Sequence, residues 1–453
     1  MSPSRDHNQW GTPPWRIDFT PPQRQLPSAA DFAVIGGGFS GLAAAAWLRL
    51  LAPEKSVVVL EAARVGHGAS GRTGGMALDG AAADDLSGLD DVLGGLQRIL
   101  TRLEIECDLA LPGAWEVARR GSPKGSPIAW NDSGTLHVVN EVRGGTLDPG
   151  KLVSGLARAA DRLGVIVAEN HAVEHVDWGD SAEIHFAGGS LRAHKVLFAT
   201  NALSLRLSGL EESSTPKLTL ATLTEPLSDT QLEEIGLAQR KPFYTVDFPY
   251  LWGRVRNDNS LLLGAGLLDA PDSDDLEDVD IAAPDAGRMF ATFERRVHGL
   301  HPALKDCRST HQWGGAGQSC FARDGGRCLP SILRARTESS SARTPGTAWR
   351  YPRFWARGLR RRCSASGNCR SGARSRRDAS SANSNVRQAQ KPAPTDICRG
   401  YSSGAYDALK WHEKTEIARF CALAASAVAF AANKLAWCPE TLALSVASPP
   451  HRI

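Results

Sequence analysis

The fold is decided by the stretch Asp31-Phe-Ala-Val-Ile-Gly-Gly-Gly-Phe-Ser-Gly41, which is soon followed by Val57-Val-Val-Leu-Glu61. An apolar run, a glycine cluster, a helical stretch and a second apolar run ending in an acid are typical of a β-α-β unit that binds a dinucleotide. Gly36 permits the tight turn, Gly38 leaves room for a pyrophosphate, and Gly41 lets the helix pack closely on the sheet. The N-terminus of the helix then faces the diphosphate charge.

The acid at the end of the second apolar run strengthens this interpretation. Glu61 stands about twenty residues after Gly41, where a carboxylate accepts hydrogen bonds from an adenosine ribose. The alternative is a glycine-rich turn with only a packing role. Such a turn needs neither the helix nor the acidic strand end, so the spacing predicts a nucleotide site.

A loop of small residues after the second predicted strand indicates which nucleotide binds. It reads Arg64-Val-Gly-His-Gly-Ala-Ser-Gly-Arg-Thr-Gly-Gly-Met76. This loop resembles the GxGASGRNGG-like loop of the glycine/D-amino acid oxidase (DAO) superfamily of FAD-dependent oxidoreductases, which lies beside the flavin and its diphosphate. The matching positions are Ser70, Gly71, Arg72, Gly74 and Gly75, while Thr73 replaces the usual Asn. An NAD(P)-dependent dehydrogenase, the third possibility, has no reason to carry this loop.

Later stretches extend the resemblance to about residues 28–325. Residues 147–167 resemble the second helix of the nucleotide domain, and Val173 follows where relatives hold adenine through backbone atoms. Lys195-Val-Leu-Phe-Ala-Thr-Asn-Ala202 is similar to the family's return strand and turn. The segments that resemble the substrate-domain sheet are Leu218–Pro226, Tyr250–Arg254 and Leu261–Gly266.

The resemblance implies an α/β fold. A Rossmann-like FAD-binding domain of the glutathione-reductase type is interleaved with an α+β substrate domain, and the C-terminal quarter is irregular. We expect an extended N-terminal arm at 1–30 and an atypical Arg/Ser/Cys-rich tail at 333–453. The FAD-binding domain is expected to comprise 31–105, 148–215 and, as a remnant, 305–332. The substrate domain is expected to comprise 106–147 and 216–304.

Composition sets further expectations. A chain of 453 residues, 42% of them hydrophobic and with a net charge of +3, is long enough for two lobes and indicates no polyanionic partner. The N-terminus lacks the apolar core of a signal peptide, and the longest apolar run, Phe420–Ala432, is too short to cross a bilayer. We therefore expect a cytoplasmic protein with no membrane span and no nucleic-acid partner. The cysteines show no metal-binding spacing, so no metal is expected.

The tail departs from the family. Residues 331–400 contain fifteen Arg, one Lys and three acids, without helical or strand periodicity. Disorder or poor packing is the favoured interpretation, with a nucleic-acid or membrane-surface arm as the rival. The family's GYxGxG-like segment, which approaches the pyrimidine end of the flavin, has only a poor match at Gly400–Gly404. Read one base later, Trp355–Leu359 can encode Gly-Leu-Val-Gly-Tyr. We therefore hypothesise that the last quarter is translated from a shifted frame.

The resemblance implies that an amine or amino acid is oxidised at its C–N bond by hydride transfer to flavin N5. Tyr250, Trp252 and Arg254 are candidates on the substrate side, since Arg254 can hold a carboxylate in bidentate geometry. A core position or a salt bridge is the alternative for these residues. His67, inside the glycine loop, is a candidate for tuning the flavin or a simple hydrogen-bonding spacer.

The cofactor expected from the resemblance is FAD. Its predicted ligands are Gly36, Gly38, Phe39, Ser40, Gly41, Glu61, Ala62, Ser70, Gly71, Arg72, Gly74, Gly75, Val173, Ala199 and Thr200. Covalent attachment through Cys320 is an open alternative to non-covalent binding. A catalytically inactive relic with a disrupted flavin clamp is the alternative to an active enzyme. The substrate, the electron acceptor and the oligomeric state stay open.

Overall fold

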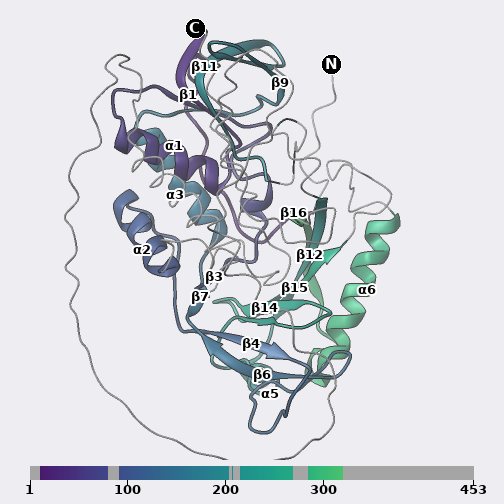
Figure 1. Cartoon of the computed structure of the whole chain (residues 1–453). Coiled ribbons are helices and arrows are strands. Elements are labelled where there is room, and N and C mark those ends of the chain that lie inside the picture. Colours follow the sequence, from purple (N-terminus) through teal and green to yellow (C-terminus); the bar gives the residue numbers. More distant parts are fainter. Residues whose placement is uncertain are drawn as a thin grey trace, which may run out of the picture. The chain divides into compact units, whose positions relative to one another are not determined.

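A computed structural model of the chain describes residues 11–79, 91–201, 203, 207, 215–268 and 284–319. These residues belong to one compact unit. Its strands form a six-stranded sheet, an eight-stranded sheet and a two-stranded ribbon (Figure 1). The expected tail and Cys320 lie outside the described residues.

The six-stranded sheet is built around the glycine motif. The strand before the glycines pairs in parallel with a neighbour on each side. One of these neighbours, the strand that leads to Glu61, pairs in parallel with a short outer strand. The other edge is an antiparallel hairpin. The order is β8 (Ile166–Ala168), β2 (Val57–Leu60), β1 (Ala29–Ile35), β11 (Gly189–Phe198), β10 (Ala182–Phe186) and β9 (Val173–Trp178).

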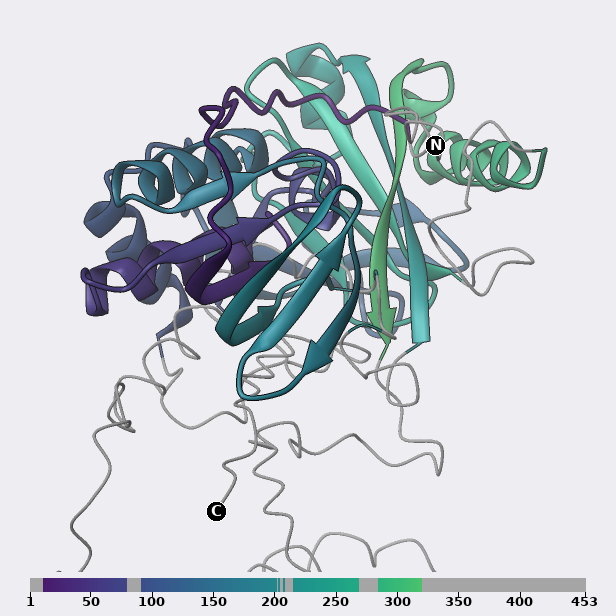
Figure 2. The same ribbon diagram turned by 90° about the horizontal axis from the view of Figure 1, so that it is seen from above.

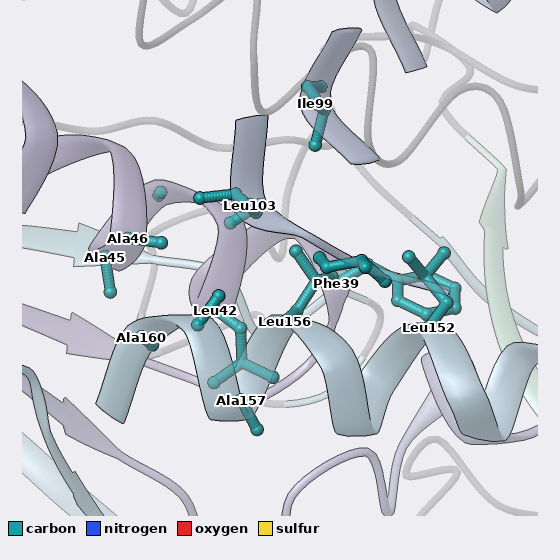
Figure 3. Close-up of a cluster of buried hydrophobic side chains, with 14 of the residues drawn as sticks. Phe39, Leu42, Ala45, Ala46, Ile99, Leu103, Leu152, Leu156, Ala157 and Ala160 are labelled. Carbon is teal, nitrogen blue, oxygen red and sulfur yellow. The ribbon is translucent and has the colours of Figure 1, made fainter. Parts of the chain in front are cut away.

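Three helices pack together beside this sheet: α1 (Phe39–Leu51), α2 (Val92–Leu103) and α3 (Pro149–Arg162). The side chains between them form one apolar cluster (Figure 3). Asp91 and Asp148 cap α2 and α3 by accepting from backbone N–H groups in the first turn. Alanines dominate the buried surface of α1, which allows the helices to approach closely.

The second sheet has eight strands. Their order is β16 (Ser309–Ser319), β12 (Thr215–Pro226), β15 (Ser260–Leu268), β14 (Leu251–Val255), β13 (Phe243–Thr245), β4 (Ala114–Ala118), β6 (Thr135–Val142) and β5 (Trp130–Asn131). The helices α5 (Asp229–Glu234) and α6 (Pro284–Leu300) contribute to the core on one face of this sheet.

The opposite face of the second sheet packs against the ribbon of β3 (Met76–Leu78) and β7 (Gly144–Thr146). Trp15 of the N-terminal arm joins the same core. β3 directly follows the glycine loop, which comprises Arg64–Gly75. The face of the second sheet that packs on β3 therefore lies next to the predicted nucleotide site. Figure 2 shows the two sheets from above.

The fold class is confirmed. The domain boundaries stay predictions. Within the segment 305–332, predicted as a remnant of the FAD-binding domain, β16 pairs antiparallel with β12 along its length. Within the described part of the chain, no helix combines the length and the apolar character needed to cross a membrane.

Candidate functional site

The predicted site lies where parallel strands end together. The strands β1, β2 and β11 run in parallel, so Gly36, Glu61 and Ala199 follow them at the same edge of the sheet. Gly36 has φ +109°, and a Cβ there would lie 2.6 Å from the Ala199 carbonyl oxygen. Only glycine therefore allows the chain to turn beside the end of β11.

Glu61 holds the glycine turn through its side chain. Its carboxylate accepts hydrogen bonds from the Gly37 N–H at 2.7 Å and from the Ala63 N–H at 3.0 Å. Burial raises the pKa of this carboxyl group, and the two backbone donors partly offset that rise. The residue predicted to bind ribose thus also fixes the conformation of the turn.

The start of α1 is held by the glycine loop. The Ser70 Oγ accepts from the Phe39 N–H at 2.9 Å, and a Cβ at Gly38 would lie 2.6 Å from that oxygen. A Cβ at Gly41 would lie 1.9 Å from the Gly36 carbonyl oxygen. The glycine pattern is therefore required by the packing of loop, turn and helix, and it leaves backbone N–H groups at the helix start.

The Arg72 side chain is directed to backbone carbonyl groups of the protein. Its guanidinium donates to the carbonyl oxygens of His67 at 3.0 Å, Gly11 at 3.1 Å and Gly314 at 3.2 Å. Burial lowers the pKa of Arg72 to about 10. The Trp313 indole N–H donates back to the Arg72 carbonyl oxygen at 2.9 Å. The predicted phosphate-side Arg thus links the glycine loop to the N-terminal arm and β16.

The end of the loop contacts the substrate-side candidates directly. A Cβ at Gly74 would lie 2.3 Å from Cζ3 of Trp252, and a Cβ at Gly75 would lie 3.0 Å from Nη2 of Arg254. Alternation along β14 places both side chains on the same face of the sheet. The structure therefore brings these two predicted regions together, although they are far apart in sequence.

Three buried polar atoms lie on β14 or on the residue just before it. Among the described residues, Tyr250 Oη, Trp252 Nε1 and Arg254 Nε have no hydrogen-bond partner. The remaining contact of the Arg254 guanidinium is a bond from Nη1 to the Leu147 carbonyl oxygen at 2.9 Å. Burial raises the pKa of Tyr250, and burial together with nearby Arg256 lowers that of Arg254 to about 10. Buried polar groups without protein partners are typical of a site that binds another molecule.

One cross-strand row that includes Trp252 runs from β6 to β16. Its members are paired in register from strand to strand, so their side chains share one face: Asn140, Glu116, Tyr244, Trp252, Gly264, Ala221 and Trp313. Glu116 is only 7% exposed and accepts from the Tyr244 hydroxyl at 2.8 Å and the Asn140 amide at 3.1 Å.

Sequence reasoning missed Glu116, Tyr244 and Asn140. The available signal was an acid in the middle of the otherwise apolar strand Ala114-Trp-Glu-Val-Ala118. That pattern indicates a buried polar group, but it does not indicate its partners, which come from β13 and β6.

Other predicted residues take varied positions. The His171 N–H donates to the Glu61 carbonyl oxygen at 2.8 Å, at the end of β2, and Val173 follows two residues later. Ala62 is exposed, and Ser40 and Thr200 are half-buried beside the turn. His67 is half-buried in the loop, and its carbonyl group accepts from Arg72. The described contacts do not join His67 to the candidates of β14.

Comparison with known proteins agrees with this arrangement. The family model described as FAD dependent oxidoreductase (DAO) matches residues 31–358. The gamma-glutamylputrescine oxidoreductase of Escherichia coli strain K12 is 28% identical over 330 residues, 63% of this chain and 73% of that protein. A probable oxidoreductase, OrdL, of Haemophilus influenzae is 28% identical over 358 residues, 65% of this chain and 74% of that protein.

A solved structure shows the same fold. The glycine oxidase from Bacillus cereus ATCC 14579 superposes with a TM-score of 0.50 at 15% sequence identity. The similarity covers 64% of this chain and 85% of the glycine oxidase.

Proposed function

Because the chain belongs to the DAO family of FAD-dependent oxidoreductases, we propose that it oxidises a C–N bond in an amine or amino acid. Its cofactor is FAD. The proposal on substrate class is supported by the names of the relatives, a gamma-glutamylputrescine oxidoreductase and a glycine oxidase. The buried face of β14 is the observation that carries it.

The residues present fit FAD in two respects. The turn before α1 is made of Gly36, Gly37 and Gly38, which add no side chain there, and a Cβ at Gly36 or Gly38 would collide with neighbouring atoms. The parallel strands end there together, as at other dinucleotide sites. The start of α1, Glu61 and the end of β11 would hold the adenosine and diphosphate part, while the 70–75 loop would lie along the remainder.

The face of β14 provides the substrate side. Arg254 is 6% exposed, and Nε has no partner among the described residues, so it is able to receive a carboxylate. Tyr250, just before β14, and Trp252 present a buried hydroxyl and a buried indole N–H, and neither has a partner within the described part of the chain. We assign Arg254 to substrate orientation, and Tyr250 and Trp252 to enclosing the reacting carbon and excluding water.

The chemistry requires little from the side chains. The flavin, when bound, supplies the two-electron acceptor for the C–N oxidation. The apolar surroundings of Trp252 lower the pKa of a bound amine by desolvation, which favours the neutral form that is oxidised. The imine product is then hydrolysed by water.

A visible absorption spectrum of the purified full chain, before and after addition of FAD, is the first test. We expect a flavin band that travels with the protein, and its bleaching when a substrate amine or amino acid is added without an acceptor. Arg254→Lys, in the same flavin-loaded state, should raise KM for amino acids much more than for amines without a carboxylate. Equal effects on both substrate kinds would contradict the role of Arg254.

A second candidate function is a relic that no longer turns over. The match to the family model ends at residue 358, inside the Trp355–Leu359 stretch that can encode a Gly-Tyr sequence when read one base later. The lost segment would be the clamp over the pyrimidine ring of the flavin. Sequencing the gene tests this candidate: a GYxGxG run in the shifted frame supports it, and close relatives with the same tail in frame contradict it. A colourless protein that FAD does not reconstitute would also favour the relic.

A further inference from the structure

The hairpin of β9, labelled in Figure 1, and β10 carries a cluster of side chains of the kinds that can bind a metal ion. His175 and His185 face each other across the two antiparallel strands, and Asp177 faces Glu183. Because side chains alternate along a strand, these four residues lie on one face. β9 is the edge strand of the six-stranded sheet, and among the described residues no strand pairs with its outer side.

The ligand atoms of three of these residues already converge. One ligand atom from each of His175, Asp177 and His185 lies within 4.8 Å of the others. Asp177 Oδ2 is 3.0 Å from Nε2 of His185 and 3.7 Å from Nε2 of His175. In a tetrahedral zinc site with bonds of about 2.0–2.1 Å, neighbouring ligand atoms are about 3.4 Å apart. The observed separations bracket this value.

Only a small side-chain change would complete the site. The two imidazole rings stack with their centroids 4.1 Å apart and an angle of 7° between their planes. A metal ion lies in the plane of each imidazole that binds it, so at least one ring must turn about its Cβ–Cγ bond. The His175 side chain is 58% exposed, which leaves room for that rotation.

We propose that His175, Asp177 and His185 bind a divalent transition-metal ion of the Zn²⁺ class. Two imidazoles and one carboxylate suit such ions, whereas Mg²⁺ and Ca²⁺ prefer oxygen ligands alone. Three protein ligands leave the fourth position to water. Glu183 is the cross-strand partner of Asp177, and its Oε1 accepts from the Ser190 hydroxyl at 3.0 Å.

The bound ion would tie the edge strand to its neighbour. The β9–β10 hairpin begins at Val173, next to the predicted adenine region, and leads into β11, which ends beside the glycine turn. A metal cross-link at this position would stabilise the outer part of the nucleotide-binding sheet without contacting the substrate side. The proposal does not depend on the substrate or on turnover.

Calorimetric titration of the full chain with ZnCl₂ at neutral pH tests the proposal. His175→Gln and His185→Gln remove one ligand each, and His194→Gln is the matched control, an exposed His on neighbouring β11 outside the cluster. We expect each ligand variant to weaken one Zn²⁺ site by about 10-fold or more, since loss of even an outer-shell partner has effects of that size. His194→Gln should bind as the wild type does. Wild-type affinity in both ligand variants, or an equal loss in the control, would overturn the proposal.

Substitution with Co²⁺ distinguishes this site from the cysteines of the chain. A site made of imidazole and carboxylate gives visible d–d bands without the near-ultraviolet charge-transfer band of a thiolate ligand. We expect these bands in the wild type and their loss in His175→Gln. A thiolate band that persists in His175→Gln, with no imidazole-type signal lost, would assign the metal to cysteine and refute the proposal.

Discussion

Replacement of Gly74 by alanine tests the contact on which the candidate site depends. The new Cβ would lie 2.3 Å from Cζ3 of Trp252, whereas carbon atoms in contact are about 3.5–4.0 Å apart. The indole ring or the loop must therefore move by roughly 1.2 Å or more. The ring has no space to retreat, since it lies over Gly264, where a Cβ would be 1.9 Å from Cζ2 of Trp252.

Overpacking of this kind costs about 1–3 kcal/mol of unfolding free energy. We expect Tm of the Gly74→Ala chain to fall by about 2–4 °C for each kcal/mol. The FAD content of the purified protein should fall as well, because the displaced loop is the one predicted to lie along the cofactor. Thermal unfolding followed by fluorescence, and the flavin absorbance of the same samples, measure the two effects.

Two further variants make the test specific. Trp252→Leu removes the ring, so adding Gly74→Ala to it should cost less than about 0.5 kcal/mol, the scale on which independent changes add. Gly287→Ala on α6 is the matched control, because its Cβ would meet no atom within 4 Å. The reasoning is refuted if Gly74→Ala leaves Tm unchanged, or if its cost is the same with leucine at position 252.

Three other predictions concern separate parts of the chain. Glu61→Ala removes the carboxylate that accepts from two backbone N–H groups at the turn. Hydrogen bonds to a charged group contribute about 1.5–3 kcal/mol, so we expect the Kd for FAD to rise by about 10- to 100-fold. An unchanged Kd in a fluorescence titration would contradict this expectation. Asp132→Asn removes the charge of a buried carboxylate, which Arg296 binds at 2.9 and 2.7 Å and which also pairs with Arg119. Urea unfolding should show that the unfolding free energy falls by about 3 kcal/mol. A change near zero would be inconsistent with this role of Asp132. Burial raises the pKa of Cys107 to about 12, so its thiol is protonated at neutral pH. Alkylation of Cys107, mapped by mass spectrometry, should be negligible in the native chain at neutral pH and should increase as the pH rises toward about 12. Rapid labelling of native Cys107 at neutral pH would disprove this prediction.

Much of the nucleotide half was predictable because its signals are local. The glycines, the apolar run before them and the acid after the next run all lie within Asp31–Glu61, where helix and strand periods and turn chemistry act over a few residues. The parallel pairing of β1 with β2 follows from that unit, whereas the pairing of β1 with the distant β11 matches the return strand expected from the family resemblance. The family resemblance supplied the cofactor and the interleaved domains.

The second sheet was less predictable. The sequence singled out Tyr250, Trp252 and Arg254 as substrate-side candidates, but it did not indicate which strands lie next to β14. The pairing of β16 with β12 was not predictable for the same reason, since a strand sequence does not specify its partner.

The sequence by itself determined that this chain contains a nucleotide-binding β-α-β unit with a flavin-type loop, because turn geometry and side-chain periodicity are encoded by neighbouring residues. Only the tertiary structure decided that Arg72 bonds to Gly11 and Gly314, that Trp252 packs on Gly74, and that Glu116 lies in the same row as Trp252. These contacts join residues far apart in the chain. They depend on strand register and on the packing of two sheets, which are fixed by the summed burial of many side chains and not by any short stretch.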